Sequence, residues 1–466
     1  MAIKMSIQGA LLPDNAAHPF SRPAPSPALR HSGCNKLFFP RHRLRWTLTV
    51  CAFAVLSATT HPAWADGGAG GASTGAGGTG GEDSAIDYGG NGGSGTSLGD
   101  GGGGGGAGNQ IGGTGGTGSG GGGGGGAGGV HGEIVTVDNS SAPSSIDGGD
   151  GGDGVAGAIG GGAGGGGGGG GYGVVVNGSN FSYTNSQIIT GGDGGNGGLS
   201  VIEGNGGNGG SGGAGLVFTN GGTLENTGII KGGDGGTGGS ASDGAAGLNG
   251  SGGAGVIGHD LTITLTGSGT ISGGLSGDGS ARADALQVSG DSYLDIEGGS
   301  SPLIGNINIQ SGTLTFSQGI DQTVDNTITG SGKLIQSAGG DLTLTGANTY
   351  SGGTQVVTGK LIAGSNHALG TGAVTLGEST IGGADFGFGA DGLNLANDFK
   401  LNEYALFSVL PGQTDAISGI ISDGSTSGSL FLSDGGTLDA GTLVLTNVNT
   451  YSGETAILEG TLKLSG

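Results

Sequence analysis

Short runs of alternating apolar and polar residues recur along the second half of the chain. In the run over 341–345, leucine alternates with threonine, so a strand there would turn its leucines to one face and its threonines to the other. The polar corner Asn-Thr-Tyr-Ser-Gly follows at 348–352. A second short strand is expected over 354–358, then Gly359 and a third strand from Lys360. This order of strand, corner and strand predicts one coil of a β-solenoid.

The same pattern returns later in the chain. Residues 342–362 and 443–463 are identical at 11 of 21 positions, and the corner Asn-Thr-Tyr-Ser-Gly is intact in both. A single coil cannot bury its own leucine row, so coils must stack, with strands about 4.8 Å apart. Apolar residues at alternate positions predict further strands upstream, and these include Leu261, Ile263, Leu265, Ile307, Ile309, Leu314 and Phe316.

These repeats resemble a known family. Leu342–Gly364 is similar to the autotransporter-associated β-strand repeat of Gram-negative autotransporter passenger domains, and 366–376 resembles its next coil. The segment 417–421 resembles the strand that precedes a fresh copy. The resemblance covers roughly 330–466. It implies a right-handed parallel β-helix and export by type V secretion, and it names no activity.

Glycine dominates the region before these repeats. The sequence contains 127 glycines, and Gly-Gly-Asp-Gly-Gly begins at 148, 191 and 232. Short apolar segments separate these tracts, so the repeat of about 42 residues is in the range of solenoids. We expect the apolar pieces to form coil strands and the glycine tracts to loop out from one edge. Alternatively, triplets such as those in 204–210 pack as extended polyglycine helices.

The chain therefore divides into four parts. We expect an extended signal peptide over 1–65, a glycine-rich disordered part over 66–130, and glycine-rich repeats with short strands over 131–254. A β-helical passenger is expected over 255–466, with repeat copies near 342–364 and 443–465. The fold class is all-β, a right-handed parallel β-helix after a glycine-rich, partly disordered region.

The leader has the three parts of a secretory signal. A basic patch over 41–45 precedes an apolar run over 46–58, and Ala63-Trp64-Ala65 supplies the small residues of a cleavage site before Asp66. The apolar run of about 13 residues falls short of the roughly 20 that a spanning helix needs. We therefore expect cleavage between Ala65 and Asp66. No long C-terminal barrel pattern is present, which departs from the family plan.

Charge is segregated along the chain. Seven of the 13 Lys and Arg and both cysteines precede residue 66, so the remainder is strongly acidic and free of cysteine. Such a surface repels nucleic acid, because phosphate binding needs clustered basic residues. Disulfide and thiol chemistry are also excluded.

Candidate chemistry is sparse. His131, His259 and His367 are the histidines after the leader, and Ser292 in Gly-Asp-Ser superficially resembles a hydrolase nucleophile within a strand pattern. The tract at 191–198 fails the nonapeptide calcium signature, since Asn196 replaces the required Asp. We therefore assign no catalytic, cofactor-binding or metal-binding residue and expect no cofactor.

The predicted function is a non-enzymatic surface stalk or adhesin. The alternatives are a β-helical polysaccharide-acting enzyme, which would need paired carboxylates, and a glycine-rich calcium-binding surface protein. We expect a monomer whose partners are host or neighbouring-cell surface molecules and not nucleic acid. Contact with the outer membrane would need a C-terminal barrel that this sequence lacks. With a translocator barrel the exported chain reaches the cell surface or the extracellular space, and otherwise it stays periplasmic.

Overall fold

The computed structural model describes residues 65–73, 75–159, 161–298, 302–378, 384–433 and 441–465. All of them belong to one compact unit, 59–466. The described residues form strands and extended segments without any α-helix, and none of their segments is a helix able to cross a membrane.

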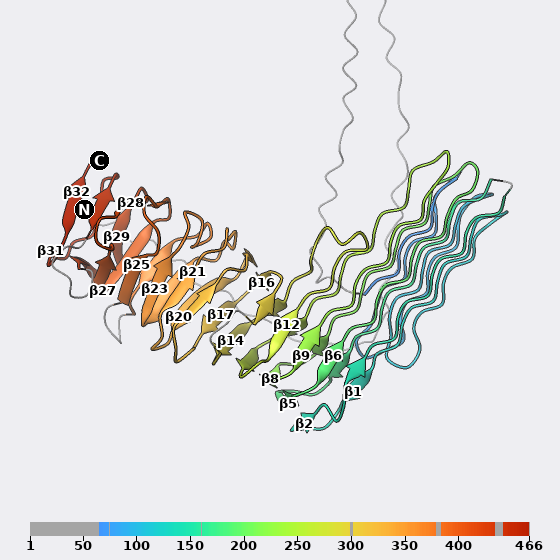
Figure 1. Cartoon of the computed structure of the whole chain (residues 1–466), viewed down its shortest axis with the longest axis horizontal. Coiled ribbons are helices and arrows are strands. Elements are labelled where there is room, and N and C mark those ends of the chain that lie inside the picture. Colours follow the sequence, from blue (N-terminus) through green and yellow to red (C-terminus); the bar gives the residue numbers. More distant parts are fainter. Residues whose placement is uncertain are drawn as a thin grey trace, which may run out of the picture. The chain divides into compact units, whose positions relative to one another are not determined.

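Parallel strands stack into continuous sheets along the chain (Figure 1). The first sheet contains β1 (Glu133–Val135), β4 (Val174–Val176), β7 (Leu216–Phe218), β10 (Val256–His259), β13 (Leu286–Ser289), β16 (Ile307–Ile309) and β19 (Ile328–Gly330). The second face contains β2 (Ser140–Ser141), β5 (Phe181–Asn185), β8 (Gly222–Asn226), β11 (Leu261–Leu265), β14 (Asp291–Ile296), β17 (Thr313–Phe316), β20 (Lys333–Ser337), β22 (Thr354–Thr358), β24 (Val374–Leu376) and the start of β27 (Phe399–Ser408).

The third face closes each early coil. It contains β3 (Ile146–Asp147), β6 (Ile188–Thr190), β9 (Ile229–Lys231), β12 (Thr270–Ser272) and β15 (Leu303–Ile304). In later coils this face contains β18 (Gln322–Val324), β21 (Leu342–Leu344), β23 (Lys360–Ala363), β25 (Ala384–Phe388), β29 (Ile421–Leu432) and β31 (Thr455–Ile457). The long strand β27 pairs with β24 of the second face and with β25 of this face, so it joins the two faces. A last sheet contains β26 (Asn394–Leu395), β28 (Thr414–Ile417), β30 (Thr442–Leu445) and β32 (Thr461–Leu464). This architecture confirms the all-β, parallel β-helix expected from the sequence.

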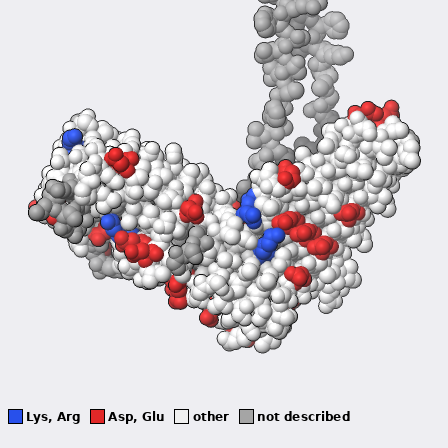
Figure 2. All heavy atoms as spheres, in the orientation of Figure 1, with Lys and Arg blue, Asp and Glu red and all other residues white. Residues whose placement is uncertain are grey.

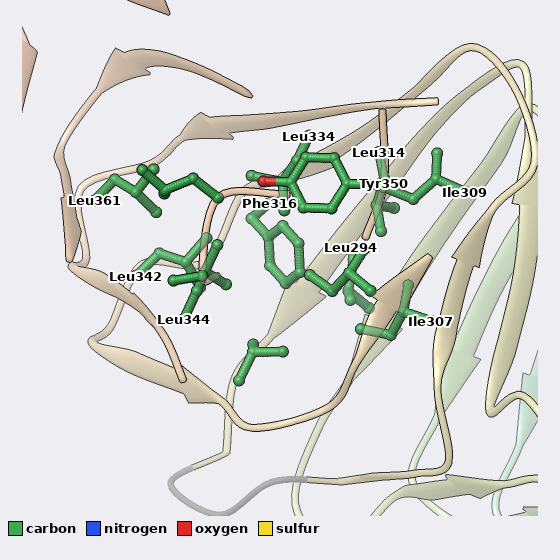
Figure 3. Packing of buried hydrophobic residues seen from close by; sticks show 14 of the residues in the cluster. Leu294, Ile307, Ile309, Leu314, Phe316, Leu334, Leu342, Leu344, Tyr350 and Leu361 are labelled. Carbon is green, nitrogen blue, oxygen red and sulfur yellow. The ribbon is translucent and has the colours of Figure 1, made fainter. Parts of the chain in front are cut away.

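One apolar interior runs through the stacked coils. Residues in register on the first sheet are fully buried, and Val174, Leu216, Val256, Leu286, Ile307 and Ile328 form one such row. Figure 3 shows side chains of several coils, among them Leu294, Phe316 and Tyr350, meeting in this interior. Burial of each leucine-sized side chain contributes roughly 1.5–3 kcal/mol, so stacking stabilises coils that could not fold alone.

The Asn-Thr-Tyr-Ser-Gly corner ties one coil to the next. Asn348 is buried, its Oδ1 accepts the N–H of Ile328 at 2.7 Å, and its Nδ2 donates to the carbonyl of Ala368 at 2.6 Å. The hydroxyl of Tyr350 shares a hydrogen bond of 2.6 Å with Oγ1 of Thr354. These bonds explain why Asn and Tyr recur in both copies of the repeat.

The glycine tracts form a hydrogen-bonded array. Three successive residues of one segment donate to three different neighbours: Gly166 to Gly102, Gly167 to Asn208, and Gly168 to Gly152. The pattern then repeats from Gly169, and a threefold repeat is that of extended polyproline II-type helices. In Figure 1 these extended segments run side by side away from the ends of β6, β9 and β12.

This array differs from two expectations. Residues 66–130, where the sequence predicted disorder, donate and accept backbone hydrogen bonds such as Gly104 N–H to Gly68 and Gly105 N–H to Gly126. The tracts after β3, β6 and β9 bond to one another, so they are not separate loops, and the polyglycine alternative describes them better. The physical reason is that bonds between backbones need no side chains, so a segment without apolar residues can still be ordered by its neighbours.

Candidate functional site

Two candidate catalytic residues have structural roles. Ser292 is fully buried, and its Oγ donates to the carbonyl of Ser289 and accepts the N–H of Leu261, both at 3.1 Å. His131 is also buried and stacks on Tyr172 with 4.6 Å between ring centroids. Burial lowers the pKa of His131. Both side chains therefore hold the fold together.

The other two histidines lie apart on the surface. His259 is exposed, with its Nδ1 3.0 Å from Oδ2 of Asp260 and its Nε2 3.2 Å from the carbonyl of Thr219. His367 lines an open hollow with Asn366, Asn397 and other polar residues. The hydrogen bonds of Ser292 all go to backbone groups, so no described histidine acts as its base.

A charged ladder crosses the outer face of the later coils. Register places Lys360 of β23 opposite Asp385 of β25, and Asp341 precedes the residue that pairs with Leu361. Burial raises the pKa of Asp341 and of Asp385, and the nearby Lys360 ammonium opposes the shift for both. The Lys360 ammonium therefore stands in register between two carboxylates, an arrangement that differs from a pair of acids sharing a substrate. Sequence spacing alone did not reveal this cluster.

The outer face of the glycine array carries a second ladder. Oδ1 of Asp150 accepts the N–H of Asp193 at 2.9 Å, and Oδ1 of Asp193 accepts the N–H of Asp234 at 2.7 Å. A parallel row continues from Asp153 to the N–H of Asn196 at 2.7 Å and from Asn196 to that of Thr237 at 2.9 Å. Figure 2 shows a row of acidic side chains on this half of the molecule, with further acidic side chains on the other half. The ladder connects successive coils across 43 and 41 positions, which are the spacings of the repeated glycine motif.

The ladder follows from the threefold geometry. In the ladder segments 148–153, 191–196 and 232–237, two of every three residues are glycine and face neighbouring segments, whereas the third is Asp, Asn or Thr on the outer face. The N–H of this third residue points outward, where no backbone carbonyl accepts it. The side-chain oxygen of the corresponding residue one coil earlier accepts it instead, as the side chain of Asp or Asn does in turns. Each acidic or amide side chain therefore caps a backbone donor.

Removing one acceptor of the acidic ladder is expected to speed amide exchange at the residue that it caps in the next coil. Asp193→Ala deletes the acceptor of the Asp234 N–H, and we expect that amide to exchange with deuterium about fivefold faster, since a net hydrogen bond contributes about 1 kcal/mol. Asp193→Asn keeps Oδ1 and should exchange like the parent chain. Equal exchange in Asp193→Ala and the parent would contradict the capping role.

Exposed apolar side chains gather where the excursions turn back. Leu98 is 77% exposed, Ile159 79% and Leu199 51%, and Ile202 lies in the neighbouring turn. Gly161 lies against Gly99 and near the carbonyl of Ile202, and Gly157 donates to the carbonyl of Leu199, so these turns are neighbours. We call the four side chains Leu98, Ile159, Leu199 and Ile202 the apolar tip. Sequence analysis missed it, although apolar residues at the midpoints of glycine tracts were visible.

A buried carboxylate holds the turns beneath the tip. Asp100 is fully buried and accepts N–H bonds from Ser73 and Ser97, both at 2.8 Å, and from Gly75 at 3.2 Å. A carboxylate that accepts several backbone N–H bonds fixes the loops around it. Asp100 therefore ties the turn that contains Leu98 to the segment at 73–75.

The predicted cleavage residues lie at the start of the described chain. Ala63 is outside the described residues, whereas Ala65 is fully buried and its N–H donates to Oδ2 of Asp83 at 3.1 Å. Asp66 accepts the N–H of Asp83 at 3.1 Å through its own Oδ1. Cleavage between Ala65 and Asp66 stays a prediction from the sequence.

Within the described ranges, no three His, Cys, Asp or Glu side chains converge as metal ligands would. The ladder carboxylates Asp150, Asp153 and Asp193 each use Oδ1 for a backbone N–H of the next coil. Their arrangement is a line of single acids, whereas Ca²⁺ takes six to eight converging oxygens.

Comparison with known proteins agrees with the architecture. A family model described as the passenger-associated-transport-repeat matches residues 334–363 and 438–464. The chain is 30% identical over 192 residues to the adhesin BmaC autotransporter of Brucella suis biovar 1 (strain 1330), a match that covers 39% of this chain and 5% of that protein. No solved structure matches.

The matched repeats contain β20, β21, β22 and most of β23 in the first copy, and β30 to β32 in the second. The relationship supports secretion to the cell surface or the extracellular space. Together, the parallel β-helix, the two matched repeats and the similarity to an autotransporter support an autotransporter passenger with passenger-associated-transport repeats.

Proposed function

We propose that this passenger is a non-enzymatic adhesin in which the β-helix is the stalk and the glycine array presents the adhesive surface. The observation that carries the proposal is the apolar tip, four exposed large side chains at the turns of the array. Exposed apolar clusters on soluble proteins mark contact sites. The similarity to an adhesin autotransporter supports the same role.

The surface around the tip limits the choice of partner. The chain carries a formal net charge of −23, and no Lys or Arg occurs between residues 66 and 230. Such a surface repels anionic membranes and nucleic acid. The partner would therefore be an uncharged or basic apolar patch on a protein of a host cell or of a neighbouring cell.

The experiment compares adhesion of beads that carry the chain from Asp66 to Gly466. The triple variant Ile159→Ser, Leu199→Ser, Ile202→Ser is expected to bind host or neighbouring cells at least about tenfold less, because interface anchors typically contribute 1 kcal/mol or more each. The matched control places serine at Ile304, Ile320 and Val448, which are exposed on the coils. Equal loss in both variants, or adhesion unchanged at the tip variant, would contradict the proposal.

A further inference from the structure

Asp83 lies among acids at the first segment of the glycine array. Its Oδ2 accepts the Ala65 N–H at 3.1 Å and a hydrogen bond from the hydroxyl of Tyr172. Burial, together with the carboxylates of Asp66 and Glu82, raises the pKa of Asp83 to about 8. Hydrogen bonds from backbone N–H groups favour the charged form of Asp83 in part, and a nearby cation would favour it further.

The sequence supplies no side-chain cation for this place. The segment from residue 66 to 230 contains neither Lys nor Arg. The nearby His131 is neutral, because its Nδ1 accepts the N–H of Tyr172 at 3.0 Å and its Nε2 is 2.7 Å from the carbonyl of Ser84. Burial lowers the pKa of His131 as well.

The leader motif supplies a cation of another kind. Hydrolysis of the Ala65–Asp66 peptide bond consumes one water and leaves a carboxylate on Ala65 and an α-ammonium on Asp66. We propose that this new α-ammonium pairs with Asp83, so that removal of the leader creates the counter-ion that the first segment of the glycine array otherwise lacks.

The geometry around Asp66 suits this pairing. Its Oδ1 accepts the N–H of Asp83 at 3.1 Å and its carbonyl accepts the N–H of Ser211 at 2.9 Å, so the residue is held on both sides. The nitrogens of Ala65 and Asp66 are about 3.5 Å apart along an extended chain. Before cleavage, the N–H of the buried Ala65 donates to Asp83. After cleavage, Ala65 is no longer attached, and the space beside Asp83 becomes open to the new α-ammonium of Asp66.

The pairing changes how the array responds to pH. Without the ammonium, Asp83 has a pKa near 8 when folded and near 3.8 when unfolded, so its contribution to stability is present below pH 3.8 and is lost as pH rises towards 8. With the ammonium, Asp83 stays ionised at neutral pH and this loss disappears. The other groups around it are Asp66, Glu82, Tyr172 and His131.

The test crosses two changes in the chain from Asp66 to Gly466: acetylation of the α-amino group and Asp83→Asn. At pH 7 we expect acetylation to speed deuterium exchange of the array amides, such as those of Gly67 and Gly104, about tenfold in the parent chain, equivalent to one pKa unit. In Asp83→Asn the same acetylation should change exchange less than twofold. An equal effect in both backgrounds, or none in the parent, would overturn the pairing.

Two further measurements keep the pairing testable if Asp83→Asn fails to fold. The α-amino pKa of Asp66, followed by NMR in the parent chain, should exceed the ordinary 7.7–8.0. Mass spectrometry of the exported protein should find Asp66 as its first residue. An ordinary α-amino pKa, or processing at another bond, would overturn the assignment whether or not the chain is an adhesin.

Discussion

Replacing Gly125 with alanine is expected to disrupt the glycine array, whereas replacing its neighbour Gly124 is expected to leave the array intact. A Cβ at Gly125 would overlap the carbonyl oxygen of Gly103 in the adjacent segment. At Gly124 the nearest atom is the carbonyl oxygen of Gly116, 3.7 Å away, which is ordinary contact. Two adjacent glycines therefore differ only in which neighbour they face.

The size of the effect follows from backbone packing. Overpacking costs about 1–3 kcal/mol even where side chains can move aside, and here the obstacle is backbone, so at least the upper end is expected for Gly125→Ala. Gly124→Ala should be neutral or stabilising by about 0.4–1 kcal/mol, because alanine reduces the entropy of the unfolded chain. Hydrogen–deuterium exchange of the array amides measures both. Similar exchange in the two variants would contradict the threefold packing.

Replacing Asn348 with alanine is expected to destabilise the β-helix by about 2–6 kcal/mol. The change leaves the Ile328 N–H and the Ala368 carbonyl without their side-chain partner in a buried corner, and each unsatisfied buried group costs about 1–3 kcal/mol. Urea unfolding followed by circular dichroism measures the loss, and exchange at the Ile328 amide locates it.

The second repeat copy supplies the control. Asn449 occupies the corresponding position, and its Oδ1 accepts the N–H of Ile421 at 2.8 Å from a half-exposed site. Water can replace that acceptor, so Asn449→Ala should cost about 1 kcal/mol or less. If both variants lost the same stability, burial of the Asn348 corner would not explain its effect.

The sequence predicted the β-helix well because its signals are local. Alternating leucines such as Leu342 and Leu344 and the corner containing Tyr350 each specify a strand or a turn, and stacking follows from the need to bury one row. The apolar pieces between glycine tracts were also predicted as strands, and β4, β6, β7 and β9 lie there.

The glycine array could not be predicted in the same way. Gly166, Gly167 and Gly168 have identical side chains, and only the arrangement of six surrounding segments assigns each its hydrogen-bond partner. The ladder partners Asp150 and Asp193 are separated by 43 residues, and the register of the coils brings them together. The apolar tip depends on the same register. Its apolar residues are visible in the sequence, but their proximity follows only from the register of the coils.

The attachment of each glycine segment to a coil strand has a consequence for assembly. Gly148, Gly191 and Gly232 directly follow β3, β6 and β9, and their N–H groups continue the strand ladder to Thr190, Lys231 and Ser272. Free glycine chains have the largest conformational entropy to lose, and these segments bury almost no apolar surface to offset it. We therefore expect the coils to act as a template, so that the glycine segments become ordered first where they join the strands and later towards their turns. The turns farthest from the coils should be the last to order and the first to fray.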